Sequence, residues 1–118
     1  IVNLVGGMIN RENVSISGNQ ALKFLADINI DLAFVAPSGL SLKDGFTSGN
    51  YSECELKHTI VEKARRVIIL MDKSKLNRCL PFTFCKLENV HAIVTDDYLP
   101  EDITSAAKEC GIDIIVAR

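Results

Sequence analysis

The sequence has no marked excess of charge of either sign and no long apolar run. Thirteen basic and 15 acidic side chains leave a formal net charge of -2, which gives no field that would gather nucleic acid. Its basic clusters are short, so we do not expect this segment to bind DNA by itself. No apolar run approaches the roughly 20 residues that cross a bilayer, and no secretory leader is present. We therefore expect a cytoplasmic protein with no membrane partner.

The sequence also lacks any C-x-x-C pair, and neither histidine stands near a likely metal-binding partner. Zinc ligands and disulfide frameworks usually show such spacings. We therefore expect no metal site and no cofactor. Instead we predict buried free thiols at Cys54, Cys79, Cys85 and Cys110.

With 118 residues, of which 47% are hydrophobic and 24% charged, the chain has the balance of one globular domain. It opens on Ile1 and runs directly into an apolar stretch. We interpret it as a piece of a longer protein.

Short apolar runs alternate with stretches of helical spacing. Such runs are typical of strands buried on both faces of a parallel sheet, and they are predicted at Ile1 to Val5, Leu32 to Ala36, Val67 to Met71, Ala92 to Val94 and Ile112 to Ala117. Helices are predicted at Gly18 to Ile28, Tyr51 to Arg65 and Pro100 to Cys110. The alternation predicts an α/β fold with a mainly parallel sheet and flanking helices. Phe82 to Cys85 is a candidate for a further short or edge strand.

The residues that follow each predicted strand are the ones to inspect for a binding site, because ligands bind at the carboxyl ends of parallel strands. Glycines, hydroxyls, carboxylates and lysines gather there, which suits a small, polar, anionic molecule. A long loop rich in glycine and serine, Pro37 to Asn50, follows the second run. Loops of that length are usually functional or mobile.

The predicted helix from Tyr51 raises a question, because Glu53 and Lys57 fall within its apolar stripe. Capping boxes are available from Ser52 to Glu55 or from Asn50 to Glu53. One interpretation is an ordinary i, i+4 ion pair at a fraying helix start. The other is that this end faces a polar cavity under the Pro37 to Asn50 loop, since burying two charges against hydrocarbon is costly.

Other candidate residues also allow a purely structural reading. Gly7 marks either a tight turn or a close approach to a ligand, and Ser15, Ser17 and Gly18 either cap a helix or help to hold an anion. Asp72 and Lys75 either cap a short turn or face the ligand. Lys43 is readily explained as a solvated loop lysine.

The run "GLSLKDGFTSGNYSECELKHTIVEKARRVIILMDKSKLNR" resembles the C-terminal sensor domain of DeoR-family bacterial transcription regulators. The matching positions are Gly39, Gly45 and Thr47 in the loop, Glu53 and Lys57 in the helix, and Asp72, Ser74 and Lys75 at the strand end. "VGGMINRENVSISGNQALKFL" and "VHAIVTDDYLP" are similar to the family's flanking segments. The resemblance therefore covers nearly the whole chain, and we predict a partial sugar-phosphate sensor domain over residues 1–118.

The resemblance implies a Rossmann-like fold related to ribose-5-phosphate isomerase, and a phosphorylated sugar as effector. It also implies a homo-oligomeric repressor that binds operator DNA through an N-terminal winged helix-turn-helix, which this segment lacks together with the first part of the sensor. The effector-binding residues that we expect are Gly7, Ser38, Gly39, Lys43, Gly45, Thr47, Glu53, Lys57, Asp72 and Lys75.

One departure bears on chemistry, because Ser38 stands where the family often has an aspartate. A general base must reach the proton it removes, and Ser38 cannot serve. We therefore predict binding without catalysis and no catalytic residue. Two alternatives stay open: a sugar-phosphate isomerase with Glu53 as base and Lys43 or Lys57 stabilising charge, and a domain that only oligomerises.

Overall fold

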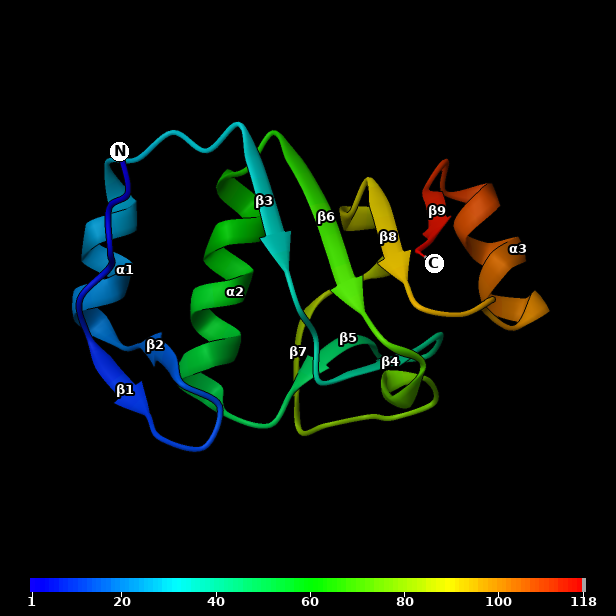
Figure 1. Ribbon diagram of the computed structural model, residues 1–118, viewed down its shortest axis with the longest axis horizontal. Helices are drawn as coiled ribbons and strands as arrows, with labels where there is room; N and C mark the ends of the chain where they lie inside the picture. The colour runs from blue at the N-terminus through cyan, green and yellow to red at the C-terminus, as the bar shows by residue number, and fades with distance from the viewer. Residues whose placement is uncertain (118) are drawn as a thin grey trace.

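A computed structural model describes residues 1–117, and a four-stranded parallel sheet forms its centre (Figure 1). The order across the sheet is β3 (Leu32–Val35), β6 (Arg66–Met71), β8 (Ala92–Thr95) and β9 (Asp113–Val116). These strands confirm four of the predicted apolar runs and the α/β class with a parallel sheet. Their carboxyl ends lie at one edge, as parallel pairing requires.

Three helices flank the sheet: α1 (Asn19–Ala26), α2 (Tyr51–Lys63) and α3 (Glu101–Glu109). Each lies within one or two residues of its predicted bounds. Asn50 caps α2, because its side chain accepts a hydrogen bond from the backbone N–H of Glu53 at 3.1 Å. Of the two capping alternatives, the one that starts at Asn50 is therefore correct. Gly111, with φ at 72°, follows α3 in the left-handed conformation that glycine favours.

The segment predicted as a long loop, Pro37 to Asn50, is instead mostly a β-hairpin. Strands β4 (Gly39–Ser41) and β5 (Gly45–Ser48) pair antiparallel, and β5 also pairs with β7 (Phe82–Cys85). The loop prediction was wrong because Phe46, at 0% exposure, stacks on Phe84 of β7 with ring centroids 6.3 Å apart. The candidate strand at Phe82 to Cys85 is confirmed.

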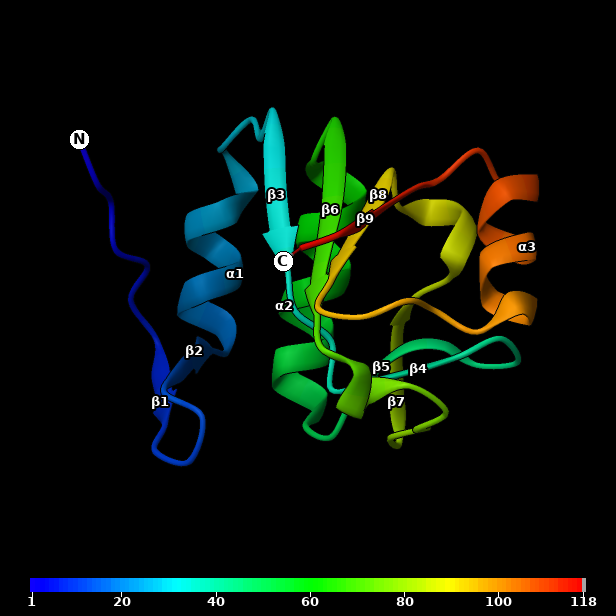
Figure 2. The same ribbon diagram turned by 45° about the vertical axis from the view of Figure 1, so that its right-hand side comes forward.

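A second hairpin, β1 (Met8–Asn10) and β2 (Ser15–Ser17), precedes α1. The predicted strand at Ile1 to Val5 is wrong: these residues have no strand partner, and Ile1 and Val2 are almost fully exposed. Strand conformation is stabilised by pairing and packing with neighbours, and within residues 1–117 this segment has no pairing partner and only Val5 is partly buried. Figure 2 shows this segment lying apart from the sheet.

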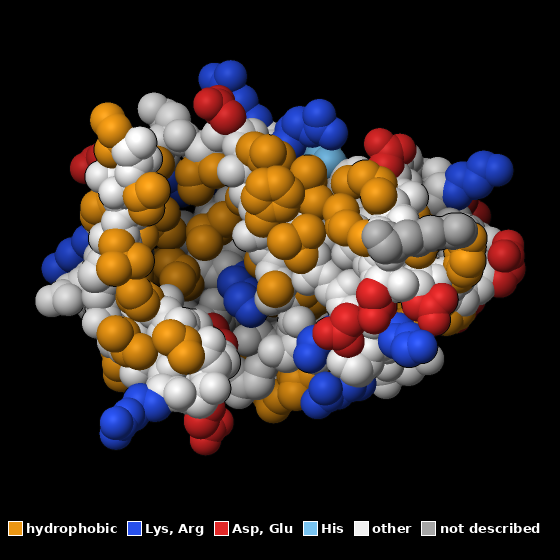
Figure 3. All heavy atoms as spheres, viewed as in Figure 1, with side chains coloured by type: hydrophobic (Ala, Val, Ile, Leu, Met, Phe, Trp, Pro, Cys, Tyr) orange, Lys and Arg blue, Asp and Glu red, His pale blue; other side chains and the backbone are white. Residues whose placement is uncertain are grey.

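The two faces of the parallel sheet differ. One face carries Val67, Ile69 and Ile93, all at 0% exposure, and packs against α2, α3 and the small antiparallel sheet. The opposite face carries exposed apolar side chains that the strand register places on one side of the sheet: Leu32, Phe34, Leu70 and Ile115. We call this second surface the bare face; Figure 3 shows apolar side chains gathered over the sheet on that side.

All four cysteines are free thiols, but only Cys54 and Cys85 are buried. The prediction of burial is wrong for Cys79 and Cys110. Cys79 lies in the exposed connection before β7, and Cys110 lies at the end of α3 on its solvent side.

Candidate functional site

Glu53 is buried in the first turn of α2, and the β1–β2 hairpin supplies its partners. The side chain is 6% exposed. Its Oε1 accepts from Asn10 Nδ2 at 3.2 Å, from Asn13 Nδ2 at 2.9 Å and from Ser15 Oγ at 2.5 Å. Oε2 accepts from Asn13 Nδ2 at 3.2 Å. Burying a carboxylate without such donors would cost free energy. The hairpin donors therefore allow Glu53 to lie on the apolar stripe of α2.

The same contacts keep this carboxylate ionised. Burial alone would raise the pKa of Glu53, but the hydrogen bonds from Ser15, Asn13 and Asn10 and the charge of Lys57 outweigh it, so the net pKa is lowered. Glu53 is therefore an anion at neutral pH, even though little of it is exposed.

Lys57, one turn further along α2, points to the carboxyl edge of the sheet. Its Nζ donates to the backbone oxygen of Ala36, just after β3, at 2.6 Å and lies 5.5 Å from the centroid of the Phe84 ring. Burial lowers the pKa of Lys57, and the charge of Glu53 only partly offsets that effect. A cation held at a strand end is well placed to meet an anionic ligand.

These positions answer the question that the sequence raised, with one correction. Among the described residues, none of the ion pairs joins Glu53 to Lys57, so a simple fraying pair does not explain them. The cover over Glu53 comes from the Met8–Ser17 hairpin rather than from the Pro37 to Asn50 segment. Figure 3 shows the surface hollowed between the hairpin side and the sheet, with a basic side chain in the hollow.

The glycines of the β4–β5 hairpin are required by close backbone packing. A Cβ on Gly39 would lie 2.4 Å from the backbone oxygen of Arg78, and one on Gly45, where φ is 78°, would lie 2.5 Å from the backbone oxygen of Cys85. Thr47 is fully buried, and its Oγ1 accepts from the backbone N–H of Leu80 at 3.0 Å. Gly39, Gly45 and Thr47 therefore fix the packing of the β4–β5 hairpin, which lies below the carboxyl edge of the parallel sheet.

Lys43 lies apart from Glu53, because the β4–β5 hairpin carries it to the opposite end of β5 from α2. It is exposed at the hairpin tip and lines a shallow surface depression with residues from η2 (Leu87–Asn89) and α3. The structure therefore does not bring Lys43 together with Glu53 and Lys57.

Asp72 and Lys75 belong to the turn after β6. The Asp72 carboxylate accepts from the backbone N–H of Ser74 at 2.8 Å and caps the short helix η1 (Lys73–Lys75), as the capping alternative predicted. Lys73 joins this turn to the next strand end, because its backbone N–H donates to Asp96 at 2.8 Å and its Nζ lies 3.2 Å from Asp97. Two strand ends are thus tied together at the carboxyl edge.

The remaining predicted residues are Ser38 and Gly7. Ser38 follows β3, two residues after Ala36, and its backbone N–H donates to the backbone oxygen of Thr47 at 2.9 Å. Gly7 lies against β2, where a Cβ would be 2.6 Å from the backbone oxygen of Ser17. It also lines a cavity of about 430 Å³ at the start of α1. No side chain caps that helix, so the helix-capping reading of Ser15 and Ser17 is wrong.

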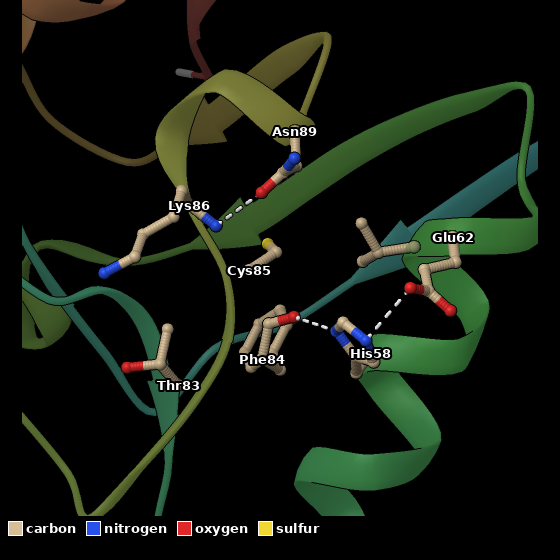
Figure 4. Close-up of a pocket in the computed structure, with 8 residues that line it drawn as sticks. His58, Glu62, Thr83, Phe84, Cys85, Lys86 and Asn89 are labelled. Carbon is tan, nitrogen blue, oxygen red and sulfur yellow. Dashed lines mark hydrogen bonds and ion pairs between the residues drawn. The ribbon is translucent and has the colours of Figure 1, made fainter.

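A different cavity, of about 350 Å³, lies between α2, β7 and η2 (Figure 4). His58 Nδ1 lies 3.0 Å from the Phe84 backbone oxygen, and its Nε2 lies 3.1 Å from Glu62. Asn89 accepts from the backbone N–H of Lys86 at 2.8 Å. None of the ten predicted effector-binding residues lines this cavity, and most of its polar groups already have partners.

Within residues 1–117, no group of histidine, cysteine, aspartate and glutamate side chains is arranged to hold a metal ion. Over the same range, no helix combines the length and the apolar character needed to span a bilayer.

Comparison with known proteins decides the family. The model of the DeoR C-terminal sensor domain matches residues 1–97. The chain belongs to this sensor-domain family. The resemblance stated from the sequence motifs is thus confirmed, and so is the expectation of an effector-sensing regulatory domain rather than an enzyme.

Curated relatives of this sensor domain are transcription regulators. It is 33% identical over 119 residues to the HTH-type transcriptional regulator GlpR of Haloferax volcanii, covering 99% of this chain and 47% of the relative. It is 32% identical over 114 residues to the HTH-type transcriptional regulator IolR of Bacillus subtilis, covering 97% and 45%. A putative aga operon transcriptional repressor of Escherichia coli O157:H7 is 26% identical over 113 residues, covering 96% and 42%. The chain therefore spans less than half the length of these relatives.

Sequence reasoning about this sensor domain missed Asn10 and Asn13, the two amides that hold Glu53. A signal was present: "NREN" places asparagines at both ends of a polar stretch between apolar residues, which favours a turn between two strands. Their pairing with a carboxylate 40 or more residues away could not be deduced from that pattern.

Proposed function

We propose that this sensor domain binds a phosphorylated sugar at the carboxyl edge of its parallel sheet, beside the β1–β2 hairpin. The observation that carries the proposal is that a buried, ionised Glu53 lies one helical turn from a half-buried Lys57 whose ammonium reaches the end of β3. A carboxylate accepts hydrogen bonds from sugar hydroxyls, and a lysine attracts a phosphate.

Most of the other effector-binding residues that we propose lie at or below the same edge of the sheet. The Asp72 to Lys75 turn and Ser38 follow the neighbouring strand ends, whereas Gly39, Gly45 and Thr47 support the edge from below through their backbone packing. Gly7 lies on the hairpin side. Lys43 is the least favoured of the ten, because the hairpin tip holds it near η2 and α3.

For the whole protein, we propose a homo-oligomeric repressor that works in the cytoplasm and reads operator DNA through an N-terminal helix-turn-helix. Relatives named as HTH-type regulators, and one named as a repressor, support this proposal, as does their greater length. The missing part would include the first portion of the sensor. The effector would act by shifting the equilibrium between two arrangements of the subunits, which requires different affinities for the two.

A ligand screen on the full-length regulator tests the effector. Ribose 5-phosphate, glucose 6-phosphate and fructose 6-phosphate are added singly, and the melting temperature and operator affinity are measured. A ligand that binds only the folded state raises the melting temperature. If a broad panel of sugar phosphates leaves both quantities unchanged, the proposal fails.

A matched pair of lysine substitutions locates the site. Lys57→Met is expected to weaken binding of the effective sugar phosphate by at least about tenfold, a loss of roughly 1.4 kcal/mol. Lys63→Met is the control, because Lys63 also donates to a backbone oxygen, that of Ala26 at 2.9 Å, but at the other end of α2. Equal effects of the two substitutions would contradict a site at Lys57.

A domain that only oligomerises is the second candidate, and the bare face supports it. Exposed apolar surface of this kind marks an interaction site. If Lys57→Ala and Asp72→Ala leave regulation by sugar phosphates and subunit assembly intact, this candidate replaces the first.

A further inference from the structure

The β1–β2 hairpin is attached to the domain with little apolar burial. Met8, Ile9 and Val14 are 61%, 59% and 79% exposed, and Ile16 is only half-buried. The side-chain hydrogen bonds from the hairpin to α2 converge on Glu53. Elements with few buried apolar contacts open at low free-energy cost, so these hydrogen bonds contribute much of what holds the hairpin.

The hairpin turn also has an unfavourable backbone. Val14 has φ at 55°, a left-handed conformation that is a genuine outlier for a β-branched residue. Asn13 supports the turn, because its Oδ1 accepts from the backbone N–H of Ser15 at 3.2 Å. Asn13 and Ser15 therefore shape the turn and bind Glu53 at the same time, so turn geometry and docking are coupled.

The docked hairpin covers the Glu53 carboxylate. Asn10, Asn13 and Ser15 all donate to Oε1, Asn13 also reaches Oε2, and the residue is only 6% exposed. The hydroxyl groups of a sugar are donors of the same kind. A sugar hydroxyl can therefore reach this carboxylate only when the hairpin moves aside, and it then takes the place of a hairpin donor.

We propose that the hairpin, residues 8–17, is a latch that is closed on Glu53 without effector and released when effector hydroxyls replace Asn10, Asn13 and Ser15. This inference rests on the proposed sugar-phosphate site and assigns it a moving part. Coupling between two binding events is reciprocal. A weaker latch must therefore strengthen effector binding, and the effector must loosen the latch.

Lys57 lies outside the latch, because its ammonium donates to Ala36 after β3 and not to the hairpin. Lys57→Met therefore weakens effector binding without loosening the hairpin. Substitutions in the hairpin act in the opposite direction on effector binding, which separates a latch residue from a contact residue.

The first experiment is amide hydrogen exchange on the full-length regulator without effector. In Glu53→Gln, amides of residues 8–17 are expected to exchange at least tenfold faster, while those of β6 are unchanged. Glu12→Gln is the matched control, because Glu12 is an exposed carboxylate in the same hairpin, and it is expected to leave exchange unaltered. Unchanged hairpin exchange in Glu53→Gln would overturn the latch, even if sugar phosphates bind.

The second experiment measures the sugar phosphate concentration that half-saturates the regulator, using whichever of the three probes named above is effective. Asn13→Ala is expected to lower it at least threefold. Val14→Gly keeps the left-handed backbone but removes its steric cost. It is expected to raise the half-saturating concentration and to slow amide exchange in the hairpin. The reverse signs would overturn the latch. If no probe binds any variant while Glu53→Gln still frees the hairpin, the sugar-phosphate proposal is lost and the latch itself stands.

Discussion

The covered face of the parallel sheet and the β1–β2 hairpin are held by different forces. Val67, Ile69 and Ile93 are fully buried among other apolar side chains, whereas the hairpin depends on hydrogen bonds to the buried carboxylate of Glu53. Apolar packing is insensitive to pH, but a carboxylate is not. One region therefore fixes the fold, and the other can respond to a polar ligand or a proton.

Of the substitutions considered, removing a core side chain should lower the free energy of unfolding the most. Ile93→Ala is expected to lower the free energy of unfolding by about 2 to 5 kcal/mol, from lost burial and the cavity it leaves. Ile115→Ala on the bare face, where the side chain is 51% exposed, is the control and should cost less than about 1 kcal/mol. Urea denaturation of both variants makes the test. Similar losses would remove the distinction between the two faces.

Removing the carboxylate should have an intermediate effect. Glu53→Ala leaves the donors of Asn10, Asn13 and Ser15 without their acceptor, and we expect a loss of about 1 to 3 kcal/mol by chemical denaturation. Glu55→Ala serves as control, because Glu55 is exposed in the same helix, and it should stay within about 0.5 kcal/mol of the parent. A Glu53 variant as stable as the Glu55 variant would contradict a role in holding the hairpin.

The pH dependence should be smaller and confined to acid. Burial would raise the pKa of Glu53, but the hairpin hydrogen bonds lower it below the ordinary 4.5. A carboxyl whose folded-state pKa is depressed contributes stability above its unfolded pKa and loses it as the pH falls through the folded pKa. The stability difference between the parent and Glu53→Gln should therefore be constant near neutral pH and shrink below pH 4.5. A difference that grows on acidification would refute the assignment.

The smallest effect on the stability of this chain is expected at the bare face. Phe34 is 60% exposed, so Phe34→Ser should change the free energy of unfolding by no more than about 0.5 kcal/mol. In the full-length regulator the same substitution should weaken subunit assembly, because an apolar patch of this kind marks an interface. Analytical ultracentrifugation of the two regulators measures assembly, and equal behaviour would argue against a covered face there.

Most of the parallel sheet could be predicted, because its apolar runs and the helical stretches between them are local patterns. Leu32, Val67 and Ala92 each fall within a run that became a strand. The run at Ile1 to Val5 has the same local pattern but no strand partner within residues 1–117. Local sequence thus indicated strand preference there and could not supply the pairing on which a strand depends.

The candidate site was predictable in part, since Glu53 and Lys57 stood out as charges on an apolar stripe. What covers Glu53 was not, because Asn10 and Asn13 reach it over 43 and 40 residues of chain. The β4–β5 hairpin was missed for a related reason. Its pairing is stabilised by the contact of Phe46 with Phe84, and its glycine-rich sequence is equally compatible with a loop.

Helix α2 is the one described helix that holds the hairpin through Glu53, the end of β3 through Lys57 and the end of α1 through Lys63. Thirteen residues make a rod about 20 Å long, and a helix tilts more readily than it bends. A tilt of about 5° at one end would carry the other by nearly 2 Å. We therefore expect that substitutions around Ala26, which Lys63 contacts, alter the response of the regulator to its effector without touching the ligand.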